Sequence, residues 1–75
     1  MIIKLIFQND EVTSEEVEFD YKGLNYPRQR EILRPSLLKE VPGAEEGKAY
    51  FVAFVEYDLM DGVVIPILTL NRLGS

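Results

Sequence analysis

The pattern of hydrophobic and polar residues near the N-terminus predicts two β-strands. Residues 2–8 place apolar side chains on both faces of an extended chain, which is typical of an interior strand. Residues 15–21 alternate between apolar and acidic side chains, which predicts a half-buried strand with one solvated face. The connection between them is polar and rich in turn-forming residues, so the pattern predicts an N-terminal β-hairpin.

A second pair of strands is expected near the C-terminus. Residues 49–58 carry apolar side chains on both faces, and we expect this strand to be central in the sheet. The Gly-containing residues 59–62 supply a hairpin turn, and residues 63–71 supply the partner strand. Because Pro66 has no backbone N–H to donate, we expect the last strand to lie at a sheet edge or to carry a bulge.

The segment between the two hairpins has a helical pattern. Residues 22–25 interrupt the preceding strand, and two short helical turns are predicted near residues 27–33 and 35–40. Pro35 argues against one continuous helix, because a proline inside a helix removes a hydrogen bond and clashes with the preceding turn. The Pro-Gly pair at residues 42–43 ends the helical segment.

The predicted fold class is therefore α+β. We expect a small single domain, residues 1–75, of two β-hairpins in a mostly antiparallel sheet, joined by one or two short helices packed on one face. A chain of this length is expected to have a net stability of about 4–11 kcal/mol.

The predicted strands carry more apolar side chains than one helical layer can cover. Either the sheet curls strongly and covers itself, or its second face meets a partner. The simplest partner is a second copy of the chain, and the residues expected at that homodimer interface are Ile2, Ile6, Ile65 and Ile67. The pattern does not decide between these two alternatives.

Composition argues against catalysis. The chain has no cysteine and no histidine, which removes disulfides, thiolate nucleophiles, the commonest general base and the commonest transition-metal ligand. The five glycines are scattered singly, so there is no Gly-rich phosphate-binding loop, and the spacing of an EF-hand is absent. We expect no enzyme activity, no catalytic or metal-binding residues and no cofactor.

The formal net charge of −5 limits the partners that the chain can bind. Phosphate backbones and anionic lipid surfaces repel an acidic domain, so direct nucleic-acid binding and membrane binding are disfavoured. No apolar run approaches the roughly 20 residues that span a bilayer, and the apolar start is too short for a secretory signal. The expected location is the cytoplasm.

Two groups of charged or aromatic residues are candidates for contact with a partner. Glu16, Glu18 and Asp20 share one strand face at a spacing of about 6.6–6.8 Å, near that of successive phosphates, and so can imitate a nucleic acid. The alternative is a solvated face that keeps the domain in solution.

The second group surrounds a loop, where Tyr26, Arg28 and Arg30 bring together residue types that are enriched at protein interfaces. Its alternatives are tyrosine rings that complete the core with arginines in ion pairs, or a nucleic-acid contact through the stretch from Arg28 to Arg34.

In its size, acidity and lack of catalytic side chains, the chain resembles the small inhibitor and accessory proteins of phages and mobile elements, although no motif carries this resemblance. The function predicted from the sequence is a non-enzymatic protein-binding module that occludes its partner sterically or through its acidic surface. A structural subunit of a homo-oligomer is the alternative, and a nucleic-acid-binding module through Arg28–Arg34 is a weaker one.

Overall fold

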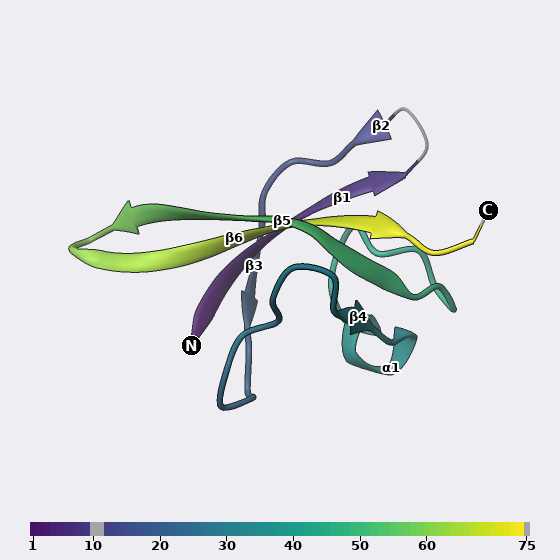
Figure 1. The fold of residues 1–75 in the computed structure, drawn as a ribbon, viewed down its shortest axis with the longest axis horizontal. Helices are drawn as coiled ribbons and strands as arrows, with labels where there is room; N and C mark the ends of the chain where they lie inside the picture. Colours follow the sequence, from purple (N-terminus) through teal and green to yellow (C-terminus); the bar gives the residue numbers. More distant parts are fainter. Residues whose placement is uncertain (10–11, 75) are drawn as a thin grey trace.

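The fold is a curled, mixed β-sheet (Figure 1). The computed structural model describes residues 1–9 and 12–74. The described residues form six strands and one helical turn: β1 (Ile2–Asn9), β2 (Val12–Thr13), β3 (Val17–Asp20), β4 (Ile32–Leu33), α1 (Pro35–Leu38), β5 (Tyr50–Met60) and β6 (Val63–Arg72). The predicted α+β class with helices packed on one face is therefore wrong, since strands dominate and α1 spans only 4 residues.

The predicted N-terminal hairpin is confirmed. β1 pairs antiparallel with β3, with Lys4 opposite Glu18 and Leu5 opposite Val17. The two-residue β2 pairs with the far end of β1. Ser14 stabilises the connection, because its hydroxyl accepts a hydrogen bond from the Phe7 amide at 2.8 Å.

The predicted C-terminal hairpin is also confirmed, and its turn explains its register. Asp61 and Gly62 have φ angles of 50° and 79°, as a two-residue type I′ turn requires. The turn pairs Met60 with Val63, and the antiparallel register then continues to Tyr50 opposite Arg72. A bulge lies between Val52 and Phe54 on β5, whereas the sequence had suggested one at the proline of β6.

The order of strands differs from the expected one. β6, not β5, is central, because the sheet runs β2-β1-β6-β5-β4 with β3 also paired to β1. β6 is parallel to β1, from Lys4 opposite Ile67 to Gln8 opposite Asn71, so the sheet is mixed rather than mostly antiparallel. Pro66 lies just before this parallel pairing begins, where the side of β6 away from β5 is open.

The predicted helix at residues 27–33 is wrong. Ile32 and Leu33 form the short strand β4, which pairs antiparallel with the start of β5. The Arg30 amide donates to the Val52 carbonyl at 2.8 Å, and the Val52 amide donates to the Glu31 carbonyl at 2.9 Å. These contacts hold the segment extended. The helix expected at 35–40 is only the single turn α1, with a proline in its first turn and no side-chain cap.

The core lies on one face of the sheet, where α1 and the loop after it cover the strands. Phe7 and Tyr50 are fully buried and meet edge to face, with ring centroids 5.1 Å apart. The Tyr50 hydroxyl accepts a hydrogen bond from the Glu45 amide at 3.0 Å, which fixes the covering loop to the sheet. The other core residues are Ile3, Leu5, Leu33, Leu38, Val41, Val52, Leu68 and Leu70.

Candidate protein-binding surface

The β5–β6 hairpin projects beyond the rest of the sheet as a two-stranded arm, which we call the hairpin arm and define as residues 54–66 (Figure 1). β1 pairs with β6 only from Ile67 onward, so β1 does not pair with the arm. The arm exposes large apolar side chains, with Leu59 67%, Val63 61% and Val64 63% accessible. These side chains have no hydrophobic layer above them, and they form the largest group of exposed hydrophobic residues in the described chain.

The outer edge of β5 is open along the arm. In the described chain, β4 pairs with β5 only at Tyr50 and Phe51, and no strand pairs with residues 53–60 on that side. The two-residue turn makes Met60 and Val63 a hydrogen-bonded pair. In an antiparallel ladder every second residue then turns its N–H and C=O groups away from the partner strand. On β5 these residues are Val55, Tyr57 and Leu59, whose backbone groups point away from β6 toward the open edge. The Leu59 amide accordingly donates to the carboxylate of its neighbour Asp58 at 2.8 Å rather than to β6.

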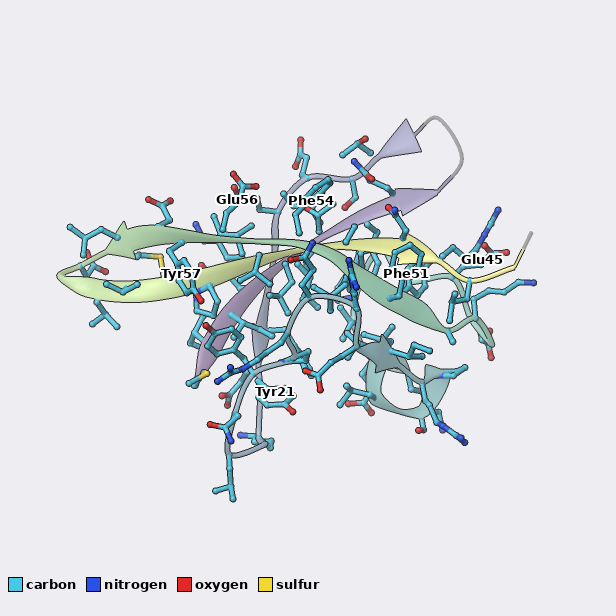
Figure 2. The ribbon with its side chains drawn as sticks, in the orientation of Figure 1. Tyr21, Glu45, Phe51, Phe54, Glu56 and Tyr57 are labelled. Carbon is cyan, nitrogen blue, oxygen red and sulfur yellow. The ribbon has the colours of Figure 1, made fainter. Side chains whose placement is uncertain are left out.

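The two faces of this β5 edge differ in chemistry. Figure 2 shows the side chains of Phe54 and Glu56 on one side of β5 and that of Tyr57 on the other. By the same alternation, Asp58 lies with Glu56, and Val55 and Leu59 lie with Tyr57. One face of the edge, which we call the acidic face, therefore carries Glu56 and Asp58 beside Phe54, and the opposite face is apolar.

A small hollow adjoins the apolar face. It measures about 330 Å³ and is lined by Val55 and Tyr57 of β5 and by Tyr26, Arg28 and Gln29 of the preceding loop. The Tyr26 and Tyr57 rings meet edge to face with centroids 6.2 Å apart, and their hydroxyl groups share a hydrogen bond. This hydrogen bond, with a smaller effect of burial, raises the pKa of Tyr26 above its usual range.

The loop residues predicted as a contact site are thus brought to the edge of β5. Tyr26 is half-buried against Tyr57, whereas Arg28 and Arg30 are exposed. Arg28 donates its backbone amide to the Glu31 carboxylate at 2.5 Å, and Arg30 has a φ angle of 75°. Of the predicted group, Tyr26 and Arg28 line the hollow. Arg30 instead contributes its backbone to the pairing with Val52.

The predicted acidic residues Glu16, Glu18 and Asp20 are exposed, and basic groups partly neutralise the row. Lys4 reaches Glu16 across the sheet at 3.3 Å. Asp20 contacts Lys22 at 2.6 Å and the amino group of Met1 at 3.3 Å. The Lys22 hydrogen bond, followed by that of the amino group, lowers the pKa of Asp20 below its usual range. Glu18 has no ion pair among the described residues.

The residues expected at a homodimer interface fall into two environments. Ile2 is 40% accessible and Ile6 is half-buried, but Ile65 and Ile67 are already buried within one chain. Ile2 and Ile65 contribute to an apolar hollow of about 360 Å³ between the start of β1 and the hairpin arm. The remaining residues that line it are Met1, Met60, Asp61, Val63, Val64 and Pro66.

Sequence reasoning missed the outer edge of β5 and the exposure of the arm. The length of the last two strands was a usable signal, since β5 and β6 have 11 and 10 residues and β1 has 8. A hairpin longer than the strand beside it must extend past the sheet. The exposed side chains of this extension that were not predicted as site residues are the large hydrophobic ones of Phe54, Tyr57, Leu59, Val63 and Val64 and the acidic ones of Glu56, Asp58 and Asp61.

No group of three acidic side chains among residues 1–9 and 12–74 is placed to hold a metal ion. Within the same residues, no helix has the length and apolar character needed to cross a membrane. No family model, curated protein or solved structure matches the chain.

Proposed function

We propose that the protein is a non-enzymatic protein-binding module and that the hairpin arm is its binding surface. The observation that carries this proposal is a projecting hairpin that exposes Leu59, Val63 and Val64 beside an open strand edge. Exposed apolar groups of this kind are typical of protein–protein contact sites, and an open strand edge is a template for pairing with another chain. Binding at the arm would block the partner's surface sterically, as an inhibitor or accessory protein does. The proposed location of the protein is the cytoplasm.

The acidic row is a weaker candidate for the contact. Two of its three carboxylates already have basic partners within the chain, at Glu16 and Asp20. A row of partly neutralised charges attracts a basic partner less than three free carboxylates would. On the arm, in contrast, the side chains of Leu59, Val63 and Val64 are each more than 60% accessible in the described chain.

Capture of partners from a lysate of the source organism tests the proposal. The tagged protein is compared with Leu59→Asn on the arm and with Leu24→Asn, which changes an equally large side chain that is 97% accessible and lies outside the arm. We expect one protein to be retained at near-stoichiometric level by the wild type and by Leu24→Asn, and to be lost with Leu59→Asn. Equal retention by both variants would exclude the arm, and loss with Glu18→Lys alone would favour the acidic row.

A homo-oligomeric subunit is a second candidate, and the apolar hollow between Ile2 and the arm supports it. A second copy that filled this hollow would cover Met1, Ile2, Val63 and Val64, all of which are exposed in the single chain. Light scattering over a range of concentrations tests this candidate. A dimer that Val64→Asn dissociates would support it, whereas a monomer at high concentration would remove it.

A further inference from the structure

We infer that the arm binds an extended segment that adds to the outer edge of β5 and alternates apolar and basic side chains. This inference rests on the proposed function and names the chemistry of the partner. It combines the open edge, the division of its two faces and the hollow beside Tyr57.

The edge can accept a strand. The unpaired stretch of β5, residues 53–60, is about 25 Å long at the rise of an extended chain. Its outward backbone groups lie on Val55, Tyr57 and Leu59, and an added strand would satisfy them through main-chain hydrogen bonds. Of the usual protections of an edge strand, this stretch lacks short length, lysine and proline, and it has the bulge beside Phe54 and the charges of Glu56 and Asp58.

The charges on the edge select the partner's side chains. Glu56 and Asp58 lie on the same face and have no ion pair among the described residues. From residue 49 to residue 71 there is no lysine or arginine. Opposite charges directly across two strands are favourable, and like charges are unfavourable. Lysine or arginine at alternate positions of the added strand would therefore face these carboxylates.

The opposite face selects apolar side chains. An added strand would meet Val55, Tyr57 and Leu59 there, and the hollow of about 330 Å³ beside Tyr57 has room for an apolar side chain. Arg28 lines this hollow, so a basic side chain on that face would be repelled. The two faces together therefore select a strand in which apolar and basic side chains alternate, rather than any segment with a high net positive charge.

A second copy of the chain fits this edge poorly. If two β5 edges paired antiparallel about Tyr57, Glu56 of one copy would face Asp58 of the other, and the reverse pair would form as well. Both contacts bring like charges together. The charge pattern therefore favours a different chain at this edge.

Synthetic peptides test the inference with the intact protein. Three twelve-residue probes are titrated by fluorescence anisotropy: alternating Val and Lys, alternating Val and Glu, and the Val/Lys composition in two separate blocks. We expect the alternating Val/Lys peptide to bind at least tenfold more tightly than the other two. Amide chemical shifts should change at Val55, Tyr57 and Leu59, on the outer edge of β5.

Charge reversal provides the matched control. The double variant Glu56→Lys with Asp58→Lys should prefer the Val/Glu peptide. The double variant Glu40→Lys with Glu46→Lys makes the same change in net charge at exposed sites outside the arm and should keep the original preference.

Equal affinity for the Val/Lys and Val/Glu peptides, shifts confined to β6, or no binding at millimolar peptide would overturn the inference. A dimer joined through the β5 edges would overturn it as well. The proposed function would survive these results if lysate capture still depended on Leu59, and it would fail separately if capture did not.

Discussion

Gly43 allows a specific test of how the covering loop packs on the core. Its φ angle is +95°, in a region that side chains with a Cβ rarely adopt. A Cβ at this position would lie 3.0 Å from Cδ2 of Phe7. The Phe7 ring cannot easily retreat, because it is fully buried and packs edge to face on Tyr50. Gly43→Ala therefore combines backbone strain with overpacking.

The expected loss follows from these two effects. Backbone strain costs about 1–3 kcal/mol, and overpacking of a filled core costs a further ~1–3 kcal/mol. Gly47→Ala is the matched control, because Gly47 has a φ angle of +76° but nothing within 4 Å of its Cβ position. Both variants place a Cβ on a backbone of positive φ, and both reduce the conformational entropy of the unfolded chain by a similar amount. These two effects cancel in the comparison, which leaves the cost of overpacking. Gly43→Ala should therefore lower the unfolding free energy by about 1–3 kcal/mol more than Gly47→Ala.

Urea denaturation followed by circular dichroism measures this difference, and thermal melting should show it at about 4–8 °C per kcal/mol. A double-mutant cycle that combines Gly43→Ala with Phe7→Leu tests whether the penalty comes from contact with the Phe7 ring. The smaller side chain should remove much of the extra penalty of Gly43→Ala, giving a favourable coupling energy. Equal destabilisation by Gly43→Ala and Gly47→Ala would refute the close packing of this loop against Phe7.

Three further predictions concern single polar contacts. Lys22→Ala should raise the pKa of Asp20 toward its usual value, and by more than acetylation of the amino terminus does; carbon-detected NMR titration measures both changes. Because the pKa of Asp20 is lowered in the folded state, its contribution to stability is present above the usual aspartate pKa. This contribution is lost as the pH falls through the pKa of the folded state. Tyr50→Phe should cost about 0.5–1.5 kcal/mol in urea denaturation, since it leaves a loop amide without its acceptor. Tyr57→Phe should lower the pKa of Tyr26 in an ultraviolet titration, and an unchanged value would contradict the hydroxyl contact.

The hairpins were predictable because their signals are local. Alternation identifies β3, and apolar runs on both faces identify β1, β5 and β6. The Asp-Gly pair at the turn has the residue types that positive φ angles require. The β4 segment was not predictable in this way. An adjacent apolar pair such as Ile32 and Leu33 suits a helix as well as a strand, and the decision is made by backbone partners on Val52, about 20 residues later.

Pairing between distant strands also limited the prediction of the site. Alternation correctly placed Glu16, Glu18 and Asp20 on one face, but the register that brings Lys4 opposite Glu18 depends on a different strand. The parallel pairing of β1 with β6 has no local signature either, and it determines where the hairpin arm begins. The exposure of the arm is therefore a property of the topology, which a reading of each segment by itself does not contain.

Pro66 explains why the sheet opens at the base of the arm. In the parallel register, Lys4 lies opposite Ile67, so the next hydrogen bond would join an N–H at position 66 to the carbonyl of Ile2. That carbonyl faces β6, because the neighbouring Met1 carbonyl accepts a hydrogen bond from Tyr21 on the other side. Proline has no N–H to donate, so the pairing ends there and leaves the hollow between Ile2 and the arm.

Pro66→Val should extend the parallel pairing by one hydrogen bond. We expect little net change in stability, because a gain of about 0.5–1.5 kcal/mol from the bond is offset by about 0.4–1 kcal/mol from the freer unfolded chain. The new amide at position 66 should be protected from hydrogen exchange, and the NMR signals of Ile2 should shift as the hollow narrows. Exchange of that amide at the rate of an unstructured chain would show that another feature separates the strands. The two edges of the arm therefore differ. Pro66 protects the inner edge of β6 from added strands, whereas the outer edge of β5 contains no proline.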